Sequence, residues 1–171
     1  MSIVINGTGT ISGISATNGL SAPQTGSVLQ VVQATNNTQY STASATPIST
    51  GIAASITPLF STSKILVIVN LACVYNASSN AGVGVLLYKA SSLLFAPSGI
   101  VASGSSYGAY GSASGNLNSF SFSYLDSPAT TSSTTYTIYE NAYTSGTAFI
   151  NYTASAVTLP TSTITLMEIA G

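Results

Sequence analysis

The run Lys64–Tyr75, KILVIVNLACVY, is apolar on both of the faces that a β-strand presents. With a period of two, one face carries Ile65, Val67, Val69, Leu71, Cys73 and Tyr75. The opposite face carries Leu66, Ile68, Ala72 and Val74, interrupted only by Asn70. A strand at the surface of a monomer needs one apolar face, because water covers the other. This run therefore predicts a central strand whose second face also needs a cover.

The other patterned segments also predict β-strands. Val, Ile, Thr, Tyr and Phe dominate them, whereas residues that favour helices are scarce. The further strands that we expect are Ser27–Thr35, Val83–Ala96 (one or two strands), Ser119–Pro128, Thr134–Tyr143, Thr147–Ser155 and Ser162–Gly171. The isoleucine spacing in Ile48–Pro58 leaves strand and loop open. About eight strands separated by turn residues are typical of an all-β sandwich.

Two local patterns refine this prediction. Phe120, Phe122 and Tyr124 alternate with serines, which predicts a half-buried strand. The segments Thr134–Tyr143 and Thr147–Ser155 flank a Thr-Ser-Gly turn, and we expect them to pair as a hairpin.

The two ends of the chain differ in character. Residues 1–26 are rich in Gly, Ser and Thr and only weakly patterned, so we expect an extended N-terminal arm there. Residues 27–171 are expected to form the sandwich domain. The segment 103–118, rich in Gly, Ser and Tyr, is predicted to be a long loop.

Charge is almost absent from the chain, and this excludes several functions. Charged residues make up 3% of the sequence, and the two basic residues are Lys64 and Lys89. No basic patch can form, so we expect neither nucleic-acid binding nor attachment to an anionic membrane. We also expect no signal peptide and no membrane-spanning helix. The formal net charge of −1 gives little electrostatic repulsion between copies, which favours association.

The order of the strand segments resembles the jelly-roll domain of small virion proteins in tailed bacteriophages. The segment YLDSP (Tyr124–Pro128), followed by a Thr-rich strand, and the C-terminal TITLMEIAG (Thr163–Gly171) carry this resemblance most clearly. Such domains are similar to the trimeric jelly rolls of the complement-component and tumour-necrosis-factor group. The resemblance covers about residues 26–171. It implies a jelly-roll sandwich and a homotrimer in which one sheet of each subunit packs against its neighbours. Leu66, Ile68, Ala72 and Val74 are then the candidate interface residues.

Candidate catalytic chemistry is sparse, because the chain has no histidine and its acidic residues are Asp126, Glu140 and Glu168. The strand parity of Glu140 and Glu168 places both on partly buried faces. They would form a glycosidase pair only if they lay about 5 to 9 Å apart. We favour the alternative that they lie near strand ends or pair with Lys64 and Lys89, because an unpaired buried charge is costly. We therefore expect no enzymatic activity.

Cofactors are not expected either. The chain has no histidine and a single cysteine, which leaves too few ligands for zinc. Calcium bound by Asp126 and backbone carbonyls stays open, although such sites usually use several carboxylates.

Together with the absence of catalytic chemistry, the resemblance implies a structural virion protein: a capsid decoration protein that forms trimeric knobs on the shell of a tailed phage. The arm, through Ile3, Ile5, Ile11 and Ile14, is expected to contact the major capsid protein or a neighbouring subunit. The alternative is a short tail-fibre or head-fibre tip that binds a host-surface glycan. Tyr107 and Tyr110 are the candidate ligand residues for that role, although they would also fit a solvated loop or a subunit contact.

Overall fold

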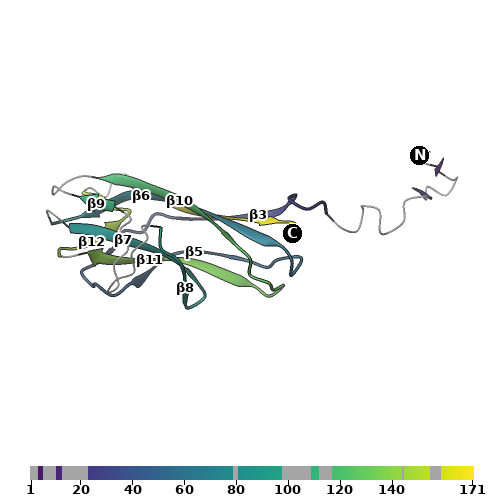
Figure 1. Ribbon diagram of the computed structural model, residues 1–171. Helices are drawn as coiled ribbons and strands as arrows, with labels where there is room; N and C mark the ends of the chain where they lie inside the picture. Colours follow the sequence, from purple (N-terminus) through teal and green to yellow (C-terminus); the bar gives the residue numbers. More distant parts are fainter. Residues whose placement is uncertain are drawn as a thin grey trace.

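The structure is a computed structural model that describes residues 4–5, 11–12, 23–78, 81–97, 109–111, 117–143, 145–154 and 159–171. Two β-sheets stack face to face as a sandwich (Figure 1). The described residues contain no helix of the length and apolarity needed to cross a membrane. Every secondary-structure element in the described part of the chain is a β-strand, so the expected all-β sandwich is confirmed.

One sheet has six strands. Its main path runs β3-β13-β6-β12-β4, and β10 also pairs with β6. These strands are β3 (Val28–Asn36), β4 (Tyr40–Thr42), β6 (Lys64–Asn76), β10 (Asn118–Asp126), β12 (Ala148–Ile150) and β13 (Ser162–Ile169). We call this the β6 sheet. Its central strand, β6, is the run that is apolar on both faces.

The second sheet has five strands in the order β5-β11-β7-β8, with β9 also paired to β7. These strands are β5 (Ile48–Ile56), β7 (Ala81–Lys89), β8 (Ser92–Phe95), β9 (Ala109–Gly111) and β11 (Thr134–Tyr143). We call this the β7 sheet. The segment Ile48–Pro58, left open by the sequence, forms a strand over Ile48–Ile56. Its buried residues Thr50, Ile52, Ala54 and Ile56 alternate with more exposed small residues.

The order of the longer strands defines a jelly roll. The chain passes back and forth between the sheets, so that β3-β13-β6-β10 lies opposite β5-β11-β7-β8, and every pair within these sets is antiparallel. This is the double Greek-key arrangement of a jelly roll. The expected jelly-roll sandwich is confirmed.

The core lies between the two sheets and is aliphatic. Its members include Ile52, Ile65, Val67, Val69, Val85, Leu87, Ile138, Ile164 and Leu166, all at most 1% exposed. Half-buried aromatic side chains of β10 and β8 pack against its margin. Phe95 lies with its ring centroid 4.8 Å from that of Tyr124 and 5.8 Å from that of Phe122. The serines of β10 are exposed, as the alternation predicts.

The expected hairpin of Thr134–Tyr143 and Thr147–Ser155 is wrong. Strand β11 pairs with β5 and β7, whereas β12 pairs with β4 and β6 in the opposite sheet. Gly146 does have a positive φ of 79°, but its turn carries the chain from one sheet to the other. It sits against Asn76 and Ser78, at the end of β6, where no side chain would fit.

Two further expectations are revised. The segment 103–118, predicted to be a loop, contains β9, which pairs with β7 through Ala81, Gly82 and Val83. In the N-terminal region, β1 (Val4–Ile5) pairs with β2 (Ile11–Ser12) as a separate two-stranded sheet. Most of the expected arm lies outside the described residues.

Candidate functional site

The two faces of β6 have different surroundings. Its inner face, with Ile65, Val67 and Val69, is completely buried between the sheets. On the outer face, Leu66 and Ile68 are only partly buried. Within one copy of the chain, the outer side of this strand therefore keeps apolar surface in contact with solvent.

A bulge at Cys73 changes which residues of β6 face outward. Cys73 has a φ of 47°, which is unusual for a residue with a side chain, and the alternation reverses after it. Val74 therefore points into the core and is 0% exposed. Its expected place on the outer face is wrong. Ala72 stays half-buried, and its backbone N–H donates to Ser162 Oγ at 3.0 Å.

The register of the β6 sheet aligns a row of apolar side chains across four strands. Met167 of β13 pairs with Val31 of β3 on one side and with Leu66 of β6 on the other. Leu66 in turn pairs with Leu125 of β10. Val31 is 55% exposed and Leu125 is 48% exposed. The row thus runs across the width of the outer face.

A polar row bounds this apolar surface on one side. Toward the C-terminal end, Ile169 pairs with Val28, which is 51% exposed. We define the outer apolar patch as Val28, Val31, Leu66, Ile68, Leu125, Met167 and Ile169. The polar row consists of Thr35, Thr163, Asn70 and Ser121, and the half-buried rings of Tyr75 and Phe149 lie beyond it on the same face.

The outer apolar patch contains no charged side chain. Lys64 borders it, because Lys64 pairs with Ile169. Lys64 is exposed on the same face, so copies can bring the apolar side chains of the patch together without burying a charge when Lys64 stays at the edge of the contact. Two of its members, Leu125 and Met167, stand at alternate positions that are otherwise Ser or Thr along their own strands and that face solvent. An apolar residue at such a position is the sequence signal that would have identified them.

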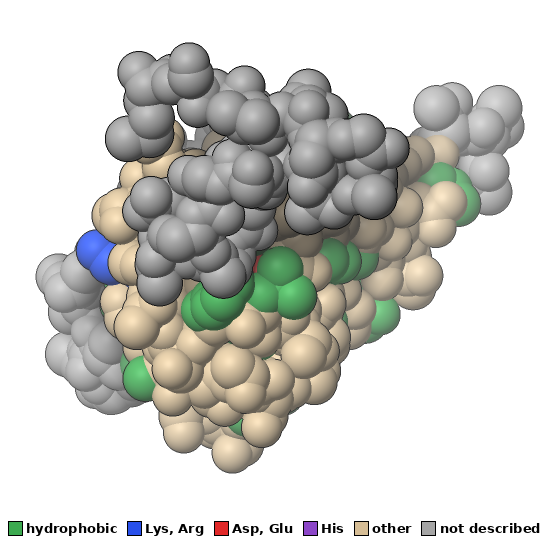
Figure 2. Space-filling view, turned by 90° about the vertical axis from the view of Figure 1, so that its right-hand side faces the viewer, with side chains coloured by type: hydrophobic (Ala, Val, Ile, Leu, Met, Phe, Trp, Pro, Cys, Tyr) green, Lys and Arg blue, Asp and Glu red, His purple; other side chains and the backbone are tan. Residues whose placement is uncertain are grey.

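The end of the molecule that carries the C-terminus is also partly apolar (Figure 2). Leu59 and Phe60, in the loop before β6, are 59% and 40% exposed. A shallow pocket of about 130 Å³ lies beside them, lined by Pro23, Phe60, Thr62, Ala170 and Gly171. Pro23, which precedes the domain, and the last residues of the domain thus lie together at this end.

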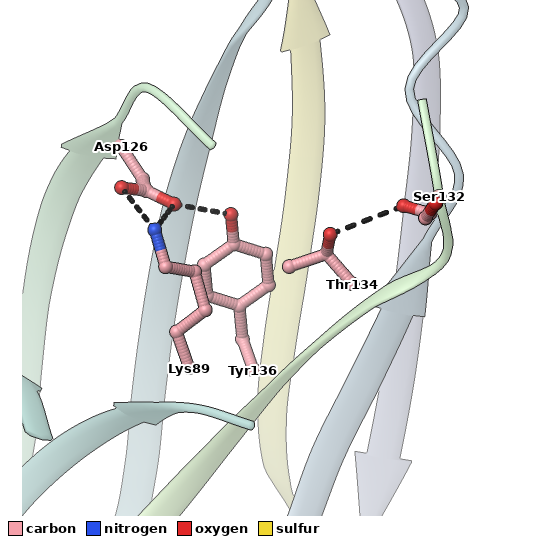
Figure 3. A network of polar contacts seen from close by, with 5 residues as sticks. All are labelled: Lys89, Asp126, Ser132, Thr134 and Tyr136. Atoms are coloured by element: carbon pink, nitrogen blue, oxygen red, sulfur yellow. Dashed lines mark hydrogen bonds and ion pairs between the residues drawn. The ribbon is translucent and has the colours of Figure 1, made fainter. Parts of the chain in front are cut away.

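Asp126 ties the two sheets together at this end (Figure 3). It belongs to β10, whereas its partners come from β7 and β11. Lys89 Nζ lies 3.1 Å from Oδ1 and 3.0 Å from Oδ2, and the Tyr136 hydroxyl donates to Oδ2 at 2.7 Å. Burial and the hydrogen bond to Asp126 raise the pKa of Tyr136 above its usual range, so the hydroxyl keeps its proton.

The network around Asp126 leaves little room for a metal site. Both carboxylate oxygens of Asp126 already accept hydrogen bonds from Lys89 or Tyr136. The described residues contain no group of three or more His, Cys, Asp or Glu side chains that could hold a metal ion.

Glu140 and Glu168 are not brought together. Glu168 of β13 pairs with Ile65 of β6, and Asp126 of β10 pairs with the same residue. Glu168 therefore lies at the level of the Asp126–Tyr136 contact. Glu140 lies four residues along β11 from Tyr136, which is about 13 Å of strand. This exceeds the spacing of a glycosidase pair. Glu168 lies next to the end of β13, as one of the two expected alternatives has it. The other alternative, pairing with lysine, is wrong: the ion pair among the described residues joins Lys89 to Asp126.

The structure leaves other sequence-predicted residues untested. Tyr107 lies outside the described residues, and Tyr110 is described only as part of β9, where it pairs with Gly82. Ile5 and Ile11 belong to β1 and β2. Ile3 and Ile14 lie outside the described residues. The roles assigned to the arm and to the tyrosines stay predictions.

No protein-family model matches the chain, and no curated protein matches it. Among solved structures, the chain is similar to the crystal structure of the infectious bursal disease virus VP2 subviral particle, with a TM-score of 0.46 and 12% identity. The alignment covers 82% of this chain and 38% of that one, so this chain spans well under half the length of the VP2 chain. A likeness of this size assigns neither a family nor a function.

Proposed function

We propose that this protein is a non-enzymatic structural component of a virion, a capsid decoration protein that forms trimeric knobs on the shell of a tailed phage. The observation that supports assembly is the outer apolar patch, an uncharged surface in register across four strands. The phage and the shell enter the proposal through the sequence resemblance described above.

The patch favours other copies of the chain as its cover. Exposed apolar patches of this kind mark interaction sites in soluble proteins. Because the surface is neutral, no oppositely charged partner is needed, and identical surfaces can approach without repulsion. A polar row separates the patch from Tyr75 and Phe149 on the same face, so a ring of copies would bring the patches together around an axis and leave the polar rows in water.

The N-terminal arm supplies the proposed contact with the shell. An isolated two-stranded sheet is at best marginally stable in water. The short β1–β2 sheet pairs with no further strand among the described residues, so a partner is expected to support it. We assign this partner role to the major capsid protein, with Ile3, Ile5, Ile11 and Ile14 as the contacting side chains.

Immunogold labelling of intact particles tests the location directly. The proposal predicts label distributed over the shell. Label restricted to the tail would contradict decoration and support the alternative, a fibre tip.

Removal of the arm tests the anchor separately. Deletion of residues 1–22 is expected to abolish co-sedimentation with undecorated capsids while the deleted protein stays trimeric. A variant with Leu59→Ser, which changes an exposed apolar residue outside the arm, is the matched control and should still bind. Full capsid occupancy by the deleted protein would contradict the anchoring role.

The glycan-binding alternative has one structural observation in its favour. Tyr75, Phe149 and Tyr152 form a half-buried aromatic cluster, in which the ring centroids of Tyr75 and Tyr152 are 4.4 Å apart. Aromatic rings offer flat apolar surface with polar edges, which suits stacking on a sugar. Binding to a glycan array that is lost in Tyr152→Ala would favour this alternative.

A further inference from the structure

Two glutamates are buried in the sandwich, and they differ in their hydrogen-bond partners. Glu168 is 0% exposed and Glu140 is 1% exposed. Glu168 accepts hydrogen bonds from Gln30 Nε2 at 2.6 Å and from the backbone N–H groups of Leu59 and Phe60 at 2.8 and 3.4 Å. In the part of the chain that the structure describes, neither oxygen of Glu140 has a hydrogen-bond partner.

The strands around Glu140 offer it no counter-charge. Glu140 lies on the inner face of β11, opposite Val85 of β7 and Ile48 of β5. The described titratable groups on the strands packed against it are Lys89 and Tyr88 of β7, Tyr40 of β4, and Tyr136, Tyr139 and Tyr143 of β11; β5 and β12 have none.

Each of these groups is engaged elsewhere or lies on the other side of the sheet. Lys89 and Tyr136 bind Asp126. Tyr88 and Tyr139 stack on each other with their ring centroids 3.9 Å apart, and Tyr139 lies on the outer face of β11. Tyr143 lies on the same outer face. The Tyr40 hydroxyl lies against Gly51.

An ionised carboxylate in such a place costs several kcal/mol, because it loses its hydration and gains no donor. The neutral acid avoids most of that cost. Burial accordingly raises the pKa of Glu140 to about 8. For Glu168, burial acts in the same direction, but its hydrogen bonds outweigh it and lower the pKa below its usual range. The presence or absence of hydrogen-bond donors therefore explains why the two pKa values shift in opposite directions.

We infer that Glu140 acts as a proton-dependent latch of the jelly roll: the folded domain holds it as a neutral acid, and its ionisation at alkaline pH loosens the β11 side of the sandwich. This inference does not depend on the proposed function in a virion. It assigns a role to a buried acid that neither assembly nor decoration requires.

The direction of the pH effect follows from proton linkage. The pKa of Glu140 is higher in the folded chain than in the unfolded chain, so the folded state holds more protons between the two values. The stabilising contribution is complete below the unfolded pKa, falls as the pH rises, and is lost once the pH passes the folded pKa. Over this window the unfolding equilibrium constant rises by up to about tenfold for each pH unit.

The composition makes this effect unusually easy to isolate. The chain contains no histidine, the side chain that ordinarily titrates between pH 5 and 8. It also contains two glutamates in all, Glu140 and Glu168. Carboxyl ¹³C labelling of glutamate therefore yields two signals, one from each buried site.

The first experiment is ¹³C NMR of the folded full-length chain with labelled glutamate carboxyls, from about pH 5 to 9. Either Glu140→Gln or Glu168→Gln assigns both signals, because each variant removes one of the two. The Glu140 signal is expected at the neutral-acid position at about pH 6 and should move only near pH 8. The Glu168 signal should stay at the carboxylate position throughout. A Glu140 signal at the carboxylate position at about pH 6 would overturn the inference.

The second experiment measures urea unfolding over the same pH range at a fixed protein concentration. The wild-type unfolding constant should rise by roughly 10- to 100-fold between about pH 6 and 8. Glu140→Gln, which is neutral at every pH, should show a flat profile. Glu168→Gln is the matched control, and it should keep the wild-type rise. A Glu140→Gln profile parallel to that of the wild type would contradict the latch, and if this variant does not fold, the NMR titration of the wild-type chain decides.

Discussion

Tyr136 donates a hydrogen bond of 2.7 Å to Asp126, and this contact joins β11 in one sheet to β10 in the other. Lys89 completes the network from β7. Sheets in a sandwich are otherwise held together by non-directional apolar contacts. A directional contact between them fixes how one sheet is placed over the other at the end where the outer apolar patch lies.

Tyr136→Phe should destabilise the domain by about 1–2 kcal/mol, because it removes the hydrogen bond to a buried carboxylate. Urea unfolding at neutral pH measures the change. Tyr139→Phe is the matched control on the same strand, because its hydroxyl has no hydrogen-bond partner among the described residues, and it should change stability by less than about 0.5 kcal/mol. Equal effects of the two variants would show that the Tyr136 contact adds little.

Asn151 is expected to be among the residues least tolerant of substitution. Its side-chain amide donates to the carbonyl oxygens of Asn36 and Thr38 at 2.9 and 3.0 Å, and its Oδ1 accepts from Ser162 Oγ at 2.6 Å. Its φ is 57°, a conformation that asparagine tolerates better than most residues. Asn151→Ala should cost about 3 kcal/mol or more, because it leaves several buried polar groups unpaired and strains the backbone.

Thermal unfolding measures this effect, with Asn70→Ala as the control. Asn70 is exposed, and its one described hydrogen bond, to Thr163 Oγ1, is 3.4 Å long. Asn70→Ala should therefore leave the unfolding temperature almost unchanged. A small effect of Asn151→Ala would contradict the assigned role of Asn151 in joining the β3–β4 connection to β13.

Native protein should resist trypsin. Trypsin has two possible sites, after Lys64 and after Lys89. These residues are the first of β6 and the last of β7, and both are paired to neighbouring strands. Incubation with trypsin should leave the folded chain intact on a denaturing gel, whereas urea-unfolded protein should be cleaved at both sites. Rapid cleavage without urea would mean that one of these strand ends opens readily.

A charge placed in the outer apolar patch should disrupt assembly. Met167→Lys puts an unpaired ammonium at the centre of the apolar row, and its burial between copies would cost about 3 kcal/mol or more. The variant should therefore dissociate at concentrations at which the wild type is assembled. Thr163→Lys, in the polar row of the same face and on the same strand, is the matched control and should stay assembled.

Parts of this structure could be predicted from local sequence because they depend on strand periodicity. The apolar faces of β6 and the alternation of Phe120, Phe122 and Tyr124 with serines both follow from a period of two. Other features depend on contacts between distant segments. The bulge at Cys73 moves Val74 from the expected outer face into the core, and a single reversal of this kind cannot be read from the pattern of one strand.

The expected hairpin after β11 was wrong for a related reason. A Gly-containing turn between two β-rich segments is typical of a hairpin, but it also suits a crossing between sheets. β12 joins the opposite sheet, where Asn151 binds the carbonyls of the β3–β4 connection. The apolar row through Met167 was likewise hidden, because the strands that form it are brought together only by the register of the folded sheet.

Sedimentation velocity of the wild-type chain at micromolar concentration shows whether further copies of this protein cover the outer apolar patch. We expect a single species with the mass of three chains, which Met167→Lys converts to single chains. A monodisperse monomer in the wild type, at the same concentration, would contradict this expectation.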